Sequence, residues 1–185
     1  MLLLLRQSLR HYSSSSKGWM SRQANDPYVR AAKASHYRAR SAFKLLQINQ
    51  KYRILHRGDV VIDCGASPGG WSQVIAEKVQ KPGLVIAIDL LPIEPIPNVH
   101  IVKGNFLKVK TQSAIQEILN ERSVDVVLSD MAPSFSGNHT ADHARSMELC
   151  ESALKFAEKV LVPGGCFVAK VKKKKWRIRI INIIT

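Results

Sequence analysis

The sequence predicts one α/β domain whose mostly parallel β-sheet carries helices on both faces. Three observations lead to this fold class. The length of 185 residues suits a single core, short runs rich in β-branched residues alternate with helical patterns, and several of these runs end in glycine or in a charged side chain. No apolar run approaches the roughly 20 residues that cross a bilayer, so we expect a soluble protein with no membrane partner.

The expected elements follow in chain order. A helix over residues 35–52 begins at Ser35, which can cap it, and carries an apolar stripe between basic side chains. A buried strand over residues 59–65 comes next and ends in glycine. The Pro-Gly-Gly run at residues 163–165 is expected to stop the last helix. The remaining helices are expected at 71–79, 111–121 and 143–160, and the remaining strands at 84–89, 99–102, 124–130 and 166–171.

The formal charge of +14 is concentrated at the two ends of the chain. Residues 1–40 carry eight Lys or Arg and one acid, and residues 170–185 carry seven and no acid, whereas residues 41–169 carry 13 of each sign. A polyanionic partner would meet these ends first, because Lys and Arg neutralise phosphates. The alternative is that one end is a targeting peptide and the other a solvated tail.

Residues 1–25 have the composition of a mitochondrial transit peptide, being rich in Arg and Ser with no acid before Asp26. A secretory signal is the alternative, but the apolar run at residues 2–5 is short and no positive charge precedes it. We therefore expect a location in the mitochondrial matrix, a folded domain over residues 26–171 and an atypical basic tail over residues 172–185.

No metal site is expected. The three cysteines, Cys64, Cys150 and Cys166, show neither a metal-binding spacing nor a disulfide framework, which fits a reducing compartment. His139 and His143 stand four residues apart but lack the adjacent Glu of a metalloprotease helix.

Four of the expected strands end in chemically specific residues, and parallel strands bring their carboxyl ends to one ligand-binding edge. The glycine-rich turn at residues 65–71 lets the backbone approach a ligand, or is structural only; it fits neither the dinucleotide fingerprint nor a phosphate loop. Asp89 can accept hydrogen bonds from ribose hydroxyls or cap the following turn. Asp130 and Lys170 end two other strands, where a charge is costly unless it reaches solvent or a partner.

These segments resemble a known family. Residues 63–73 (DCGASPGGWSQ), 89–92 (DLLP), 129–133 (SDMAP) and 163–170 (PGGCFVAK), with 37–44 (YRARSAFK), are similar to motifs of the FtsJ-like (RrmJ-type) ribose 2′-O-methyltransferases. The resemblance implies a Rossmann-like S-adenosylmethionine-dependent methyltransferase fold. It also implies a monomeric rRNA (uridine) 2′-O-methyltransferase acting on mitochondrial large-subunit ribosomal RNA or its pre-ribosomal particle, in support of ribosome biogenesis.

The resemblance assigns site residues position by position. Catalysis falls to Lys44, Asp130 and Lys170. Relatives often have Asp where this chain has Asn105, and Asn keeps an acceptor and a donor for the adenine. Cofactor contacts fall to residues at the strand ends: Pro68, Gly69, Gly70, Trp71, Asp89, Asn105 and Asp130.

The hypothesis for the reaction makes Lys170 the base, with Asp130 orienting it and Lys44 steadying the target ribose or its phosphate. A free Lys has a pKa of about 10.4, so Lys170 needs burial or nearby positive charge to act near neutrality, while Asp130 opposes that change. Lys44 is otherwise an ordinary exposed lysine. Arg38 and Arg40 on the same helix are expected to contact phosphates without reading sequence.

The family resemblance is expected to end at Val171, as if the C-terminus were truncated or replaced. The family continues with a helix and two strands that include a catalytic Glu, whereas no acid follows Glu158 here. The sheet is then expected to lack its last strands and leave an exposed edge, unless the alternating Ile and Arg residues of the tail pair there as one strand. The alternatives in function are a catalytically impaired RNA-binding or ribosome-assembly protein, and a methyltransferase for small molecules or proteins.

Overall fold

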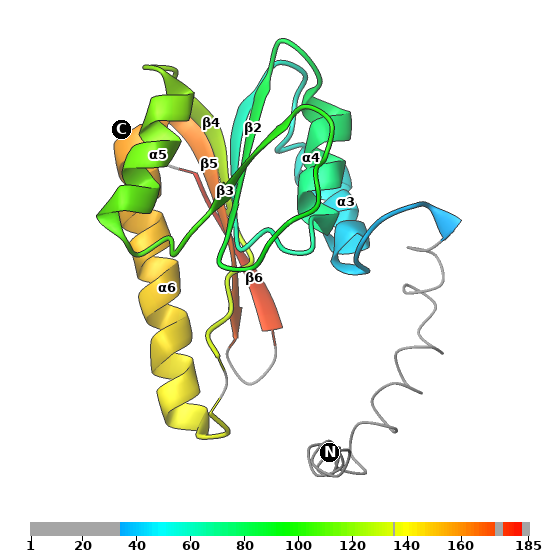
Figure 1. The fold of residues 1–185 in the computed structure, drawn as a ribbon. Coiled ribbons are helices and arrows are strands. Elements are labelled where there is room, and N and C mark those ends of the chain that lie inside the picture. The colour runs from blue at the N-terminus through cyan, green and yellow to red at the C-terminus, as the bar shows by residue number, and fades with distance from the viewer. Residues whose placement is uncertain (1–33, 135, 173–175, 183–185) are drawn as a thin grey trace, which may run out of the picture.

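The computed structural model describes residues 34–134, 136–172 and 176–182. The expected transit peptide lies outside the described residues. The helices of the described residues are, in the labels of Figure 1, α3 (Ser41–Tyr52), α4 (Gly70–Val79), α5 (Val109–Leu119) and α6 (His139–Val160). The strands are β1 (Val60–Cys64), β2 (Leu84–Asp89), β3 (Val99–Lys103), β4 (Val124–Ser129), β5 (Leu161–Lys172) and β6 (Trp176–Asn182).

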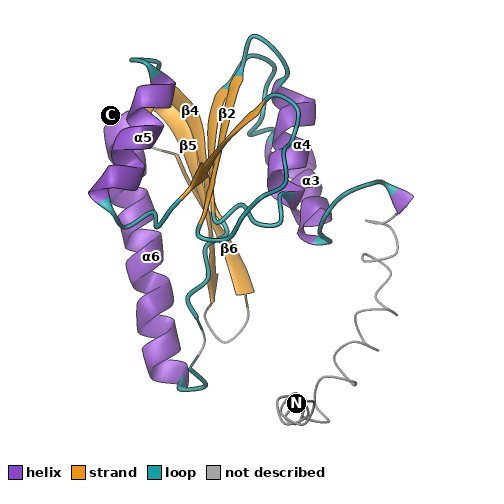
Figure 2. Ribbon diagram, viewed as in Figure 1, coloured by secondary structure: helices purple, strands orange, loops and turns teal. Residues whose placement is uncertain are grey.

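All six strands form one sheet in the order β3-β2-β1-β4-β5-β6. The first five are parallel to one another, and β6 is antiparallel to β5. Helices α3 and α4 cover one face of the sheet, and α5 and α6 cover the other (Figures 1 and 2). The predicted α/β class is therefore confirmed, and the strand order reverses between β1 and β4, where such sheets bind ligands.

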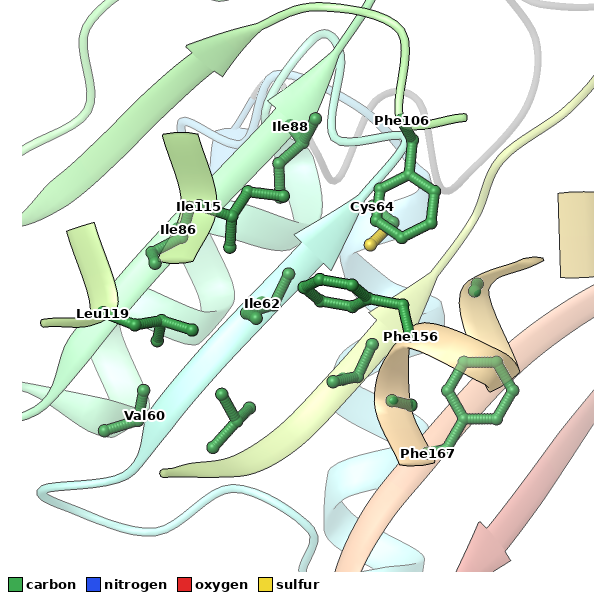
Figure 3. Packing of buried hydrophobic residues seen from close by; sticks show 14 of the residues in the cluster. Val60, Ile62, Cys64, Ile86, Ile88, Phe106, Ile115, Leu119, Phe156 and Phe167 are labelled. Atoms are coloured by element: carbon green, nitrogen blue, oxygen red, sulfur yellow. The ribbon is translucent and has the colours of Figure 1, made fainter. Parts of the chain in front are cut away.

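Two apolar layers hold the helices on the sheet. One packs β-strand side chains such as Ile62 and Ile86 against Ile115 of α5 and Phe156 of α6 (Figure 3). The other packs Leu45 of α3 and the α4 side chains against the opposite face. Strand β1 is buried along its whole length, which agrees with its β-branched residues Val60, Val61 and Ile62.

The first helix begins later than predicted, at Ser41 instead of Ser35. His36 has a positive φ of 59°, and the backbone N–H of Arg38 donates to Oε1 of Gln73 at 2.8 Å. The N–H of Arg38 therefore bonds to α4, a choice that local propensity does not encode.

The last predicted helix begins earlier than expected, at His139 instead of residue 143. Asn138 caps it, because its side chain accepts hydrogen bonds from the N–H groups of Thr140 and Ala141. The helix ends at Val160 as expected, but β5 begins directly afterwards. The Pro-Gly-Gly run lies inside that strand, at a register shift between the pairs Val124–Leu161 and Val126–Cys166.

The edge of β5 is covered, contrary to the expectation of an exposed edge. Strand β6 pairs with β5 from Cys166 opposite Asn182 to Lys172 opposite Trp176. The alternative that the alternating Ile and Arg residues form one strand is thus confirmed. Residues 176–182 belong to the sheet and are not a separate tail. Within the described residues, no helix has the length and apolarity needed to span a membrane.

Candidate active site

Strand register brings the chemically specific residues to one edge of the sheet. Cys64 at the end of β1 pairs with Ile88 of β2 and with Ser129 of β4. Ser129 in turn pairs with Ala169 of β5. The residues that follow on β1, β4 and β5 therefore lie together, as the sequence predicts.

Asp130 and Lys170 form an ion pair at this edge. Nζ of Lys170 lies 2.7 Å from Oδ1 and 3.1 Å from Oδ2 of Asp130, with side chains 27% and 18% exposed. The N–H of Asp130 also donates to the carbonyl of Cys64 at 3.0 Å, which fixes the backbone where the strand ends. Burial raises the pKa of Asp130, and the Lys170 ammonium offsets this only in part. Two of the three predicted catalytic residues are thus in direct contact.

Lys44, the third, is not bonded to this pair. It projects from the exposed side of α3, whose opposite side is buried through Ala42 and Leu45. Among the described residues, Lys44 makes no hydrogen bond or ion pair. Its side chain is therefore available to a ligand that arrives from solvent.

The glycine-rich turn after β1 is shaped by close contacts within the protein. A Cβ on Gly65, whose φ is +83°, would lie 2.7 Å from the backbone nitrogen of Met131. A Cβ on Gly69 would lie 3.0 Å from Nη1 of Arg38, and one on Gly70 would lie 3.0 Å from Cβ of Ala39. These glycines are required for packing, whatever ligand the turn also binds.

Pro68 and Trp71 differ in what they can offer to a cofactor. Pro68 is exposed at the tip of the turn. The Trp71 side chain is only 3% exposed, and its Nε1–H donates to the carbonyl of Ser41 at 2.9 Å. The indole is therefore a core group that joins α4 to α3, and only the backbone N–H of Trp71, in the first turn of α4, can meet a ligand.

Asp89 performs the turn-capping role that the sequence offered as an alternative. Its Oδ2 accepts from the N–H of Ser67 at 2.9 Å, and its Oδ1 accepts from the N–H of Leu91 at 2.8 Å. Each carboxylate oxygen has a second lone pair, so a ligand hydroxyl can still bind. Asn105 accepts from the N–H of Leu107 through Oδ1 at 2.9 Å, which leaves its amide nitrogen as the donor for a ligand.

Asp63 belongs to this edge, although the sequence reasoning gave it no role. Its side chain is fully buried; Oδ2 accepts from the hydroxyl of Ser72 at 2.6 Å, and Oδ1 has no hydrogen-bond partner among the described residues. Burial raises the pKa of Asp63 to about 7; the bond from Ser72 lowers it, and the charges of Asp130 and Asp89 raise it further. The signal in the sequence was a single acid inside an otherwise apolar strand.

Arg38 does not take the outward position expected of a phosphate contact. Its guanidinium donates to the carbonyls of Pro68 at 3.4 Å, Glu94 at 2.6 Å and Pro95 at 2.8 Å. The side chain is half-buried and bonded within the protein. Arg40 is exposed at the start of α3, and its contact with RNA stays a prediction.

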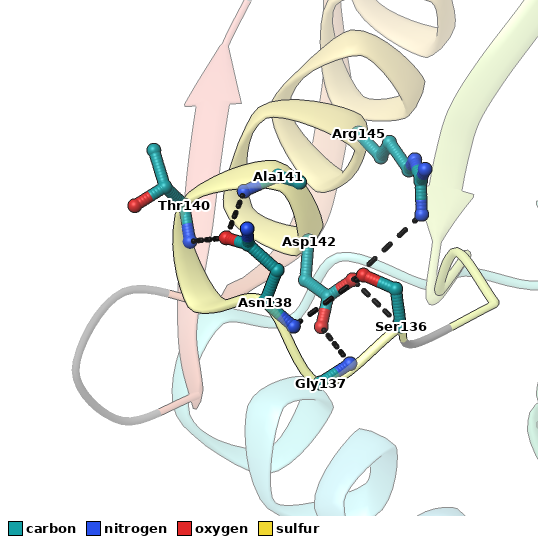
Figure 4. Close-up of polar contacts among 7 residues, drawn as sticks. All are labelled: Ser136, Gly137, Asn138, Thr140, Ala141, Asp142 and Arg145. Atoms are coloured by element: carbon teal, nitrogen blue, oxygen red, sulfur yellow. Dashed lines mark hydrogen bonds and ion pairs between the residues drawn. The ribbon is translucent and has the colours of Figure 1, made fainter.

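The loop that follows Asp130 is fastened to α6 by Asp142 (Figure 4). Oδ1 of Asp142 accepts from the N–H and the hydroxyl of Ser136, both at 2.8 Å, and Oδ2 accepts from the N–H of Gly137 at 3.2 Å. The bond from the Ser136 backbone is the largest of the effects that lower the pKa of Asp142. Asp142 is 4% exposed, so a buried carboxylate holds Ser136 and Gly137 of the loop against the first turn of α6.

The family model described as FtsJ-like methyltransferase matches residues 37–184. The chain belongs to this family. Its Rossmann-like methyltransferase fold is as the sequence predicts, and the protein is a methyltransferase. The match extends beyond Val171, where the resemblance was expected to end, and it includes β6.

Relatives of this methyltransferase are similar over most of their length. Ribosomal RNA large subunit methyltransferase E of Acinetobacter baumannii is 48% identical over 159 residues, which are 86% of this chain and 74% of the relative. The protein of the same name from Azoarcus sp. is 46% identical, over 86% of this chain and 78% of the relative. The crystal structure of a ribosomal RNA methyltransferase from Plasmodium falciparum has a TM-score of 0.68 and 34% identity, covering 73% of this chain and 78% of that one.

Proposed function

We propose that this methyltransferase transfers a methyl group from S-adenosylmethionine to a ribose 2′-hydroxyl of large-subunit ribosomal RNA and so supports ribosome biogenesis. The observation that carries the proposal is the Asp130–Lys170 pair at the ends of β4 and β5, next to the point between β1 and β4 where the strand order reverses. The names of the relatives support ribosomal RNA as the substrate.

The charges at the strand ends fit S-adenosylmethionine. Asp63, Asp89 and Asp130 gather close enough to raise the pKa of Asp63, and Oδ1 of Asp63 lacks a partner among the described residues. Such an edge favours a ligand with sulfonium and ammonium groups and disfavours a dinucleotide, whose phosphates are negative. Asp89 would hold the ribose hydroxyls and Asn105 the adenine, while the backbone of the turn from Pro68 to Trp71 would hold the methionine end.

The protein's chemical task is alignment and removal of one proton. When bound, S-adenosylmethionine supplies a methyl group that its sulfonium already activates. Lys170 first releases one ammonium proton to solvent; its neutral Nζ then takes the proton from the ribose 2′-hydroxyl, and Asp130 keeps that nitrogen at the edge of the sheet. Alignment of two bound reactants contributes several kcal/mol to such a transfer. Lys44, exposed on α3, steadies the ribose or its phosphate.

RNA reaches the site across the exposed basic side of α3. Arg40 and Lys44 both lie there in contact with solvent. Such side chains bind phosphates and position RNA without reading its sequence. The basic residues at the two ends of the chain add a sequence-independent attraction.

We also propose that the protein acts in the mitochondrial matrix, from the Arg- and Ser-rich composition of residues 1–25. Import of the labelled full chain into isolated mitochondria tests this. Protection from added protease is expected for the full chain and not for a chain without residues 1–25. Equal protection of both would contradict the proposal.

The test of the function is transfer of labelled methyl from S-adenosylmethionine to isolated large-subunit RNA and to large-subunit particles. The proposal predicts precipitable label that ribonuclease removes and protease leaves. Label that only protease removes would indicate a protein methyltransferase. No label, from protein that binds both the cofactor and the RNA, would favour a binding or assembly role.

A further inference from the structure

We propose that Arg38 is a positioning residue that sets the geometry of the cofactor site by joining its two loops. The inference rests on the proposed use of S-adenosylmethionine. The two loops are the glycine-rich turn after β1, which contains Pro68, and residues 90–98 after β2. One guanidinium donates to a carbonyl of the first loop and to two carbonyls of the second.

The backbone at Arg38 is held in place by hydrogen bonds to α4. The backbone N–H of Arg38 donates to Oε1 of Gln73 on α4 at 2.8 Å, and Nε2 of the same Gln73 donates to the carbonyl of His36 at 3.1 Å. Tyr37, between them, donates its hydroxyl to Glu77 of α4 at 2.7 Å. The backbone from which the Arg38 side chain extends is therefore held against α4, so the guanidinium links the two loops to that helix.

The two loops also meet through Asp89, on the side of the expected ligand. Asp89 binds the N–H groups of Ser67 in the first loop and Leu91 in the second. Arg38 provides a second tie between the same loops, through carbonyls instead of N–H groups. Charge-assisted hydrogen bonds from a guanidinium are stronger than those between neutral groups, so loss of Arg38 leaves the separation of the loops to Asp89 and to apolar packing of Ile93 and Ile96.

The Arg38 side chain also packs closely against Gly69 in the first loop. A Cβ at that position would lie 3.0 Å from Nη1 and 3.3 Å from Cδ of Arg38. Arg38 and Ile96, whose Cδ1 would lie 2.8 Å from that Cβ, thus share the space beside the turn that a side chain at residue 69 would need. Because Arg38 lies only a few residues before α3, the tie also joins the cofactor loops to the helix that carries Arg40 and Lys44.

Calorimetric titration of S-adenosylmethionine into the full-length protein tests the role of Arg38. Arg38→Met keeps the aliphatic stem, Arg38→Lys keeps the charge but loses the fork, and Arg57→Met changes an exposed arginine as the matched control. We expect the dissociation constant to rise about tenfold or more in Arg38→Met and by less in Arg38→Lys. Arg57→Met should bind as the unchanged protein does.

Kinetics separate positioning from loss of folded protein. Arg38→Met should raise the KM for the cofactor while kcat at saturating cofactor stays within about threefold, since binding common to ground and transition states affects KM alone. A merely structural role would reduce the active fraction, and so kcat, at unchanged KM. Binding by both Arg38 variants equal to that of Arg57→Met would overturn the inference. Failure of the unchanged protein to bind the cofactor would instead overturn the proposed function, on which the inference depends.

Discussion

Lys170 Nζ lies 2.7 Å from Oδ1 of Asp130 because the strands that carry them are paired in parallel with Ser129 opposite Ala169. Asp130 directly follows the end of β4, and Lys170 lies at the same level within β5, where it pairs with Ile178 of β6. Backbone pairing of β4 with β5 therefore brings the two side chains together.

Removal of the Lys170 amine should strongly reduce methyl transfer without changing the fold. Lys170→Met is expected to lower kcat by about 100- to 10,000-fold, the range for loss of a general base. Lys78→Met, on the exposed side of α4, is the control and should keep full activity. Single-turnover assays at saturating cofactor measure the difference, and unchanged kcat in Lys170→Met would exclude Lys170 as the base.

Burial of Asp63 predicts a stability that depends on pH. Its folded pKa of about 7 exceeds its ordinary value of 3.8, so the folded protein holds a proton that the unfolded chain releases. The stability that this proton contributes is fully present below the ordinary pKa and is lost as the pH rises through about 7. The slope of the free energy of unfolding from this group is at most about 1.4 kcal/mol per pH unit.

Asp63→Asn removes this titration and keeps an acceptor for Ser72. Its free energy of unfolding relative to the unchanged protein should increase as the pH rises from about 5 to about 8. Urea unfolding across that range measures the difference, in which titrating groups that do not interact with Asp63 cancel. A constant difference would show that Asp63 is ionised in the folded protein throughout.

Alanine substitutions at two glycines with similar φ values distinguish the cost of backbone strain from the cost of a steric clash. Gly65 and Gly58 have φ values of +83° and +92°, but a Cβ meets the Met131 backbone only at Gly65, while nothing lies within 4 Å at Gly58. Gly58→Ala is expected to cost about 1–2 kcal/mol of stability, from backbone strain alone. Gly65→Ala should cost more and also reduce transfer, because Met131 follows Asp130. Equal losses in denaturant unfolding would contradict the close approach of β1 and β4.

Asp142 is expected to support catalysis from a distance. Asp142→Asn replaces one acceptor oxygen with a donor, so it cannot accept from both Ser136 and Gly137. We expect lower thermal stability and a kcat reduced by about 10- to 100-fold, since the loop after Asp130 is no longer held. Glu158→Gln, exposed on the same helix, is the control. Full activity of Asp142→Asn would show that the loop holds its position without this acid.

The strands and the central pair could be predicted from the sequence because both depend on local features. Continuous β-branched runs indicate buried strands, and a charge at the end of such a run is costly without a partner. The Asp130–Lys170 contact then follows from parallel pairing alone. Asp89 was predicted only in part. Its position at the end of a strand was predictable, but the sequence could not decide between capping of the following turn and binding of ribose hydroxyls.

The remaining features depend on contacts that leave little trace in the sequence. Arg38 binds backbone carbonyls, which every residue carries, so nothing in its sequence neighbours distinguishes it from Arg40, for which a phosphate contact is proposed. The helix start at Ser41 depends on Gln73, more than 30 residues away. Pairing of β6 with β5 depends on a nearby open edge, which a local pattern of Ile and Arg does not reveal.

The most direct test of the central claim is where the methyl group resides after the reaction. Large-subunit RNA labelled by the protein and S-adenosylmethionine is hydrolysed with alkali, which cleaves every linkage except one that follows a 2′-O-methylated ribose. We predict label in an alkali-resistant dinucleotide with the unchanged protein and its loss with Lys170→Met. Label in alkali-released mononucleotides would place the methyl on a base and contradict the proposed ribose chemistry.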